Sequence, residues 1–188
     1  MGGADHVTTL PDQIRLQTVA GTMSPEAALT QTVGLTAARI DQVEATDGPD
    51  PWIVIGGVLM AQQAAAIALR AAGDSIPAQA GATELLLRAA SKDRLPAPFT
   101  LPFGSAARQG FERLVEVRNN FMHPRGLAWF VSADTLSRAL PTASRAVRHL
   151  ILTQPILTDL VSPAQQREID SALSAIEAFA EFLDDSTH

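Results

Sequence analysis

The chain has 188 residues, a length typical of one domain that buries a core without disulfide or metal support. Its 46% hydrophobic and 18% charged residues exclude wholesale disorder, and the lack of cysteine excludes disulfides, thiolate metal sites and a cysteine nucleophile. Because the formal net charge is −6, any contact with nucleic acid has to come from a local basic patch.

The start of the chain and its apolar runs predict a location. Residues 1–10 carry neither the basic start nor the apolar stretch of a secretory signal, and the longest apolar run, residues 52–61, is too short to cross a bilayer. We therefore expect a cytoplasmic protein without a membrane partner. We assign residues 1–23 to an N-terminal extension, residues 24–161 to a helical bundle, and residues 162–188 to a C-terminal helix packed on it.

Capping and turn residues bound the first two predicted helices. Ser24, Pro25 and Glu26 start the first helix, since serine caps a helix, proline suits its first position and an acid suits its first turn. The Gly-Pro-Asp-Pro turn at residues 48–51 ends it. Residues 52–72 form the second helix, whose apolar character on nearly every side indicates a central position in a bundle or burial in an oligomer interface.

The middle of the chain predicts two more helices separated by a loop. The first is short, at residues 80–90, and the loop covers residues 92–104 because three prolines interrupt them. The second helix starts near Ser105 and ends before Pro124. The apolar residues 127–131 that follow are either a short strand or a packed loop.

The last third of the chain is again helical in pattern. Helical periodicity resumes after Ser132, is expected to break at Pro141, and continues to about Thr153. Ser162 and Gln165 have the spacing of a capping box and open the last helix. Since strand patterns are nearly absent, the sequence predicts an all-α, antiparallel bundle of five or six helices.

The helix before Pro124 carries a charged residue where apolar ones are expected. Its broad apolar face consists of Phe111, Leu114, Val115, Phe121 and Met122. Arg118 falls in the middle of this face, and its guanidinium stays charged, so it requires a carboxylate, backbone carbonyls, a wet cleft or a ligand phosphate. The structural alternative is an ion pair with Asp41, Glu44 or Glu84.

His123 ends the same predicted helix. A helix C-terminus favours a charged histidine, so His123 is either a capping residue or an acid or base that works near neutral pH. In an unbroken helix it lies about 140° around the axis from Arg118. Pairing across a dimer, or unwinding before Pro124, would bring the two side chains together.

Arg118, Asn119 and His123 form the pattern Arg-Asn-x-x-x-His, which continues as Pro124-Arg125-Gly126. This run resembles the HEPN superfamily, whose mark is an arginine, four to six residues and a histidine, often with a polar residue after the arginine. Residues 59–71 resemble the second helix of that superfamily, and residues 82–90 fit its short helix before the motif. The resemblance covers about residues 25–153.

The resemblance implies a helical bundle that forms a homodimer and brings two motifs to one cleft, where many members cut RNA without a metal or other cofactor. It implies that His123 acts as a general base or acid, that Arg118 holds the scissile phosphate, and that Asn119 orients the phosphate or the histidine. Members of this kind serve in defence or toxin–antitoxin systems, which implies an antitoxin or a nucleotidyltransferase as a protein partner.

Some positions depart from the relatives. Arg125 stands where toxin-type members often have a tyrosine, and Gln62 and Gln63 stand where a glutamate is common. A second hypothesis is therefore a non-catalytic HEPN module that binds RNA, a nucleotide or a protein partner. A third is a plain helical dimer in which Arg118 and His123 are structural.

Further arginines surround the motif. Arg113 and Arg125 are candidate nucleic-acid contacts, because they lie close to it in the sequence on an otherwise acidic chain. The alternative is a solvated face in which such arginines pair with Glu112 and Glu116. No histidine or acid spacing predicts a metal site, and no glycine-rich phosphate loop is present.

Overall fold

The computed structural model of the chain describes residues 23–43, 50–91, 93–98, 105–123, 131–157 and 159–186. Most of these residues are helical, and none of them forms a strand, as the sequence predicts. The helices are α1 (Pro25–Val43), α2 (Pro51–Ala71), α3 (Ala82–Ala89), α4 (Ser105–Met122), α5 (Ala133–Val147) and α6 (Pro163–Asp185). A π-helical turn (Arg148–Leu152) extends α5, and a short 3₁₀ turn (Pro155–Leu157) follows it.

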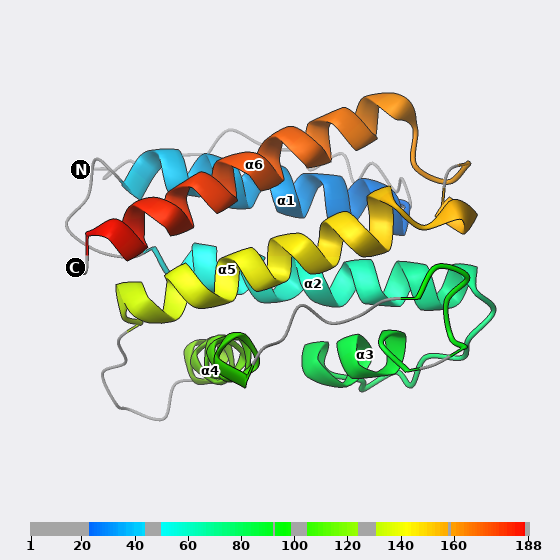
Figure 1. Cartoon of the computed structure of the whole chain (residues 1–188), viewed down its shortest axis with the longest axis horizontal. Helices are drawn as coiled ribbons and strands as arrows, with labels where there is room; N and C mark the ends of the chain where they lie inside the picture. The colour runs from blue at the N-terminus through cyan, green and yellow to red at the C-terminus, as the bar shows by residue number, and fades with distance from the viewer. Residues whose placement is uncertain are drawn as a thin grey trace, which may run out of the picture.

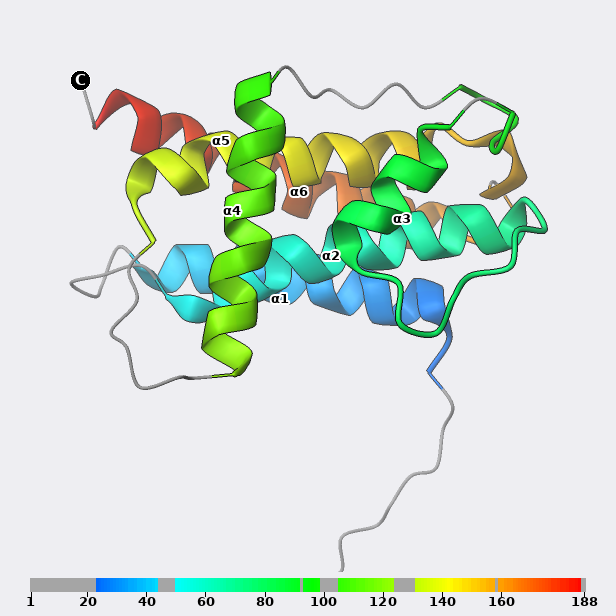
Figure 2. The ribbon, with the colours of Figure 1, turned by 90° about the horizontal axis from the view of Figure 1, so that it is seen from below.

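The helices are arranged in three layers. Figure 1 shows α1 and α6 in one outer layer, α2 and α5 in the middle, and α3 and α4 on the other side. Figure 2 shows that α4 runs across α2 and α5 instead of along them. The hairpins α1/α2 and α5/α6 are antiparallel, but α2 and α5 run in the same direction (Figure 1). The prediction of antiparallel neighbours therefore holds within each hairpin and is wrong between them, because α3 and α4 intervene in the chain between α2 and α5 and return it to the end where α2 begins.

α2 is the central helix and packs against α1, α3, α4 and α5. It starts at Asp50, whose Oδ1 accepts a hydrogen bond from the N–H of Trp52 at 2.9 Å. After its last turn the chain reverses at Gly73, whose φ of +79° suits glycine. Among the described residues α2 alone is long and apolar enough to cross a membrane, and 67% of its most apolar window is buried in the bundle. That burial is typical of a core helix.

α1 and α2 approach closely at one point. A Cβ atom added to Gly56 would lie 2.0 Å from Oγ1 of Thr36, closer than any real contact. Thr36 is itself buried, and its hydroxyl donates to the carbonyl of Thr32 at 2.7 Å. Glycine at position 56 therefore sets the spacing between the two helices.

The predicted break at Pro141 is wrong, because Pro141 lies inside α5. Proline in a helix removes an N–H donor and costs about 3 kcal/mol. The helix continues because both flanking turns are buried: Leu140 and Ala143 are fully inaccessible to solvent. The hydroxyl of Thr142 donates to the carbonyl of Arg138 at 3.1 Å, so its polar group is also satisfied within the helix.

Other predictions agree with the structure or need small corrections. α3 lies within the predicted residues 80–90, and Ser162 and Gln165 form the capping box that opens α6. Met122 is 54% exposed, so its predicted place on the apolar face is wrong. Val117, 3% exposed, takes that place because α4 buries the side that faces α2 and α5. Of residues 127–131, all but the buried Val131 lie outside the described residues.

Candidate functional site

Arg118 lies on α4 and is partly buried. Its Nε atom is inaccessible to solvent and has no hydrogen-bond partner among the described residues. Of the three acids predicted as structural partners, Asp41 and Glu84 form no salt bridge with it, and Glu44 lies outside the described residues. Arg118 therefore carries a charge that no described acid neutralises.

An open cavity of about 440 Å³ adjoins this guanidinium, and we call it the Arg118 pocket. One wall is formed by residues 78–84, which connect α2 to α3 and begin α3. The other walls come from Gln62 of α2 and from Val115 and Asn119 of α4. The structure thus brings Arg118 and Asn119, two of the predicted site residues, to one cavity.

An ion-pair cluster holds the connection that forms this wall. Arg88 donates two hydrogen bonds to the Asp74 carboxylate, each 2.7 Å long, and Nη1 of Arg94 lies 3.4 Å from Oδ1 of the same group. The hydrogen bonds from Arg88 hold the pKa of Asp74 below its usual range, and the same bonds raise the pKa of Arg88. Nε2 of Gln62 donates to the carbonyl of Ala80 at 3.1 Å. The pocket wall is therefore tied to both α2 and α3.

His123 follows α4 directly, and its side chain is exposed. Its N–H donates to the carbonyl of Asn119 at 3.0 Å, so the backbone stays helical up to this residue. His123 is not one of the residues that line the Arg118 pocket. A single copy of the chain therefore does not bring Arg118 and His123 together, in agreement with their separation on the helical wheel.

The arginines of the exposed side of α4 are paired with acids. Arg113 lies 2.5 Å from Glu116, and Arg108 lies 2.9 Å from Glu112. All four side chains are exposed, so these pairs contribute little to stability. The arrangement is that of a solvated, salt-bridged face, and Arg125 lies outside the described residues.

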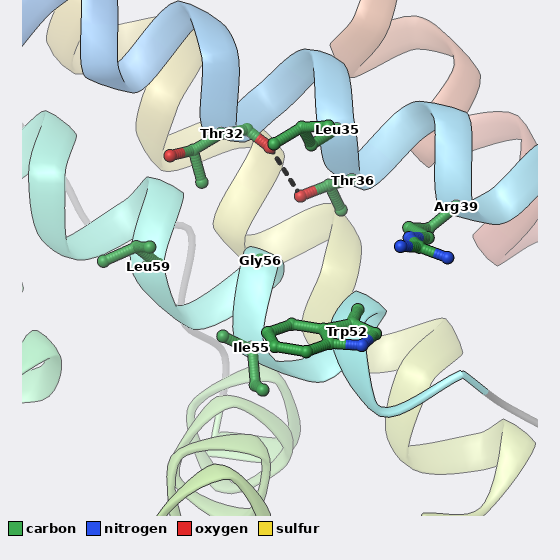
Figure 3. Close-up of a pocket in the computed structure, with 8 residues that line it drawn as sticks. All are labelled: Thr32, Leu35, Thr36, Arg39, Trp52, Ile55, Gly56 and Leu59. Carbon is green, nitrogen blue, oxygen red and sulfur yellow. Dashed lines mark hydrogen bonds between the residues drawn. The ribbon is translucent and has the colours of Figure 1, made fainter. Parts of the chain in front are cut away.

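A second cavity, of about 330 Å³, lies between α1 and α2, and we call it the apolar groove. Figure 3 shows Leu35 of α1 facing Trp52, Ile55 and Leu59 of α2 across it. Leu35 is 57% exposed and Trp52 54%. The apolar groove is therefore a candidate interaction surface.

The apolar groove continues toward the end of α4. The ring of Trp52 meets the ring of Phe121 edge to face, with 6.4 Å between centroids. The next residue, Met122, is exposed and immediately precedes His123. Exposed apolar surface therefore reaches the candidate histidine.

The apolar groove was not predicted from the sequence. Glu84 was predicted only as a structural ion-pair partner of Arg118, and it lines the Arg118 pocket without forming that salt bridge. The signal for the groove lies in Leu35, which follows Val33 by two positions and so falls outside the apolar stripe of its helix. An apolar residue off the buried stripe is a candidate for a surface contact. The place of Glu84 in the pocket wall depends on how α3 packs beside α4, which no local sequence pattern shows.

Comparison with known proteins finds no protein family, no curated protein and no solved structure that matches the chain. Within the described residues, no group of three or more histidines and acids is placed to hold a metal ion.

Proposed function

We propose that the chain is a cytoplasmic, homodimeric HEPN-type endoribonuclease that works without a metal, and whose site combines Arg118 and Asn119 of one copy with His123 of the other. One observation carries the proposal: the Arg118 guanidinium is partly buried beside an open cavity, and no described acid neutralises it. An uncompensated buried charge costs on the order of several kcal/mol. An anion such as an RNA phosphate is the ligand that this arrangement favours.

The outward face of α2 offers a surface for the second copy. Trp52, Ile55, Leu59 and Gln62 are spaced three or four residues apart and form one stripe along the helix. The stripe begins in the apolar groove and ends at Gln62, which lines the Arg118 pocket. In a two-fold contact, the same stripe of two copies meets in opposite directions. The His123 end of one copy then lies against the Arg118 pocket of the other.

The proposed reaction is attack by a ribose 2′-hydroxyl on the adjacent phosphorus. The bond from phosphorus to the 5′-oxygen breaks, which leaves a 2′,3′-cyclic phosphate and a 5′-hydroxyl. His123 removes the proton from the 2′-hydroxyl and returns a proton to the leaving oxygen. Arg118 balances the negative charge that grows on the phosphate, and the Asn119 amide donates a hydrogen bond to it.

The test is cleavage of single-stranded RNA by the purified chain in the presence of EDTA. We expect products that end in cyclic phosphate, and a loss of at least about 100-fold in kcat/KM for Arg118→Ala and for His123→Ala. Arg138→Ala is the control, since Arg138 is exposed on α5 and paired with Asp134. Undiminished cleavage by both site variants would contradict the assignment.

A second candidate function is RNA or nucleotide binding without turnover. The observation that favours it is the position of His123, which does not line the Arg118 pocket of its own copy. In that case Arg118→Ala weakens RNA binding, His123→Ala has no effect, and no cyclic phosphate forms. The same samples therefore separate the two functions.

A further inference from the structure

The Arg118 pocket is larger than a phosphate needs. Its volume of about 440 Å³ lies within the range of pockets that enclose whole small molecules, about 300–1,000 Å³. The guanidinium contributes only one of its walls. The remaining space runs along the first turn of α3, at residues 81–84.

The first turn of α3 presents both an acceptor and donors to this space. Glu84 is exposed, lines the pocket, and forms no hydrogen bond with any described side chain. Its basic neighbour one turn on, Arg88, donates its hydrogen bonds to Asp74, at 2.7 Å, and interacts with Glu84 through charge alone. The helix starts at Gly81, which has no side chain to cap the N–H groups of the first turn. A carboxylate without a hydrogen-bond partner and uncapped N–H groups thus border the same cavity as a guanidinium without a salt bridge.

A ligand that satisfies all three groups carries an anion and a planar edge with both donors and an acceptor. Guanine has two adjacent donors, N1–H and N2–H, which match the two oxygens of one carboxylate, and its O6 is an acceptor beside them. Uracil has a single N3–H between two carbonyl oxygens, which a carboxylate repels. Carboxylates accept such charge-assisted bonds strongly, and single-stranded RNA is read on these base edges.

We propose that the Arg118 pocket binds a guanine nucleotide, with its phosphate on Arg118 and its base edge on Glu84 and the start of α3. This inference rests on the proposed function in one respect, since it names the base that adjoins the phosphate in the RNA. It makes Glu84 a specificity-determining residue, whereas Arg118 binds phosphate whatever the base.

The experiment is a calorimetric titration of the full chain with guanosine monophosphate, uridine monophosphate and inorganic phosphate, each in a separate run. We expect the guanine nucleotide to bind at least about tenfold more tightly than the uracil nucleotide, the value of one charge-assisted hydrogen bond. Glu84→Gln should remove this preference and leave phosphate binding unchanged. Arg118→Ala should weaken all three ligands. Glu112→Gln, on the exposed side of α4, is the control and should change none.

The outcomes separate this inference from the nuclease proposal. Equal affinity for the two nucleotides, or a preference that survives Glu84→Gln, overturns the guanine pocket even if the chain cleaves RNA. Selective guanine binding that depends on Glu84, in a chain that cleaves no RNA, supports the pocket and contradicts the nuclease. If the chain cleaves RNA preferentially next to guanine, and Glu84→Gln removes this preference, the result supports both the guanine pocket and the nuclease.

Discussion

Among single residues, Arg118 combines burial with an unmatched charge. A guanidinium that gives up water without a carboxylate partner lowers the stability of the fold. Residues that bind anionic ligands commonly carry such a cost, and their replacement by apolar residues then stabilises the protein. The stability of Arg118 variants therefore distinguishes a ligand-binding arginine from a structural one.

Arg118→Met tests this distinction, since methionine keeps an unbranched, flexible side chain and removes the charge. We expect the free energy of unfolding to stay the same or to rise by up to about 2 kcal/mol, measured by urea denaturation. A structural ion pair would instead make the variant less stable by about 3–5 kcal/mol. Arg88→Met, which removes the hydrogen bonds to Asp74, should lower stability and serves as the comparison.

Asp74 gives the stability a defined dependence on pH. Its pKa is lowered from the usual value of 3.8 by hydrogen bonds from Arg88, so the folded state binds this proton less readily than the unfolded state. The stabilisation is complete above pH 3.8 and is lost as the pH falls through the lower, folded value. The wild type should therefore melt at a higher temperature than Asp74→Asn at pH 6, and the difference between the two melting temperatures should shrink below pH 3.8. A constant difference across this range would refute the role of the ionised carboxylate.

At the scale of helices, the contact between α1 and α2 depends on a missing side chain. Gly56→Ala places a methyl group against Thr36, so the helices have to separate. We expect the free energy of unfolding to fall by about 1–3 kcal/mol. Gly34→Ala is the matched control in α1, because the new Cβ atom would lie 4.0 Å from its nearest neighbour. Alanine at this position should raise the free energy of unfolding by about 0.5–1 kcal/mol. Thermal unfolding measures both. Equal effects of the two substitutions would show that the close approach is not what glycine provides.

The helices were predictable where local residues decide them. The side chains of Ser162 and Gln165 accept hydrogen bonds from each other's backbone N–H within one turn, so the sequence alone predicts the capping box. The continuation of α5 through Pro141 was not predictable, because it depends on the burial of Leu140 and Ala143 against other helices. The crossing of α4 over α2 and α5 has the same origin, since periodicity gives the buried face of a helix and not its direction (Figure 2).

At the scale of the whole molecule, the candidate site was predictable in part. The sequence pointed to Arg118 because a charge in an apolar face stands out on a helical wheel, and it pointed to Asn119 through the resemblance to the HEPN motif. The walls of the pocket were not predictable, since residues 78–84 reach it through the packing of α3 beside α4. The separation of His123 from that pocket makes the assembly of two copies the decisive question.

Complementation between two inactive variants tests the shared site most directly. Arg118→Ala and His123→Ala chains are mixed, allowed to exchange subunits, and assayed for RNA cleavage. If each site takes Arg118 from one copy and His123 from the other, half of the dimers contain one intact site, and activity returns to about a quarter of the wild-type value. Adding Trp52→Glu to both chains should abolish the recovery by disrupting the apolar groove. No recovery in a mixture that forms dimers, beside an active wild type, would contradict the composite site.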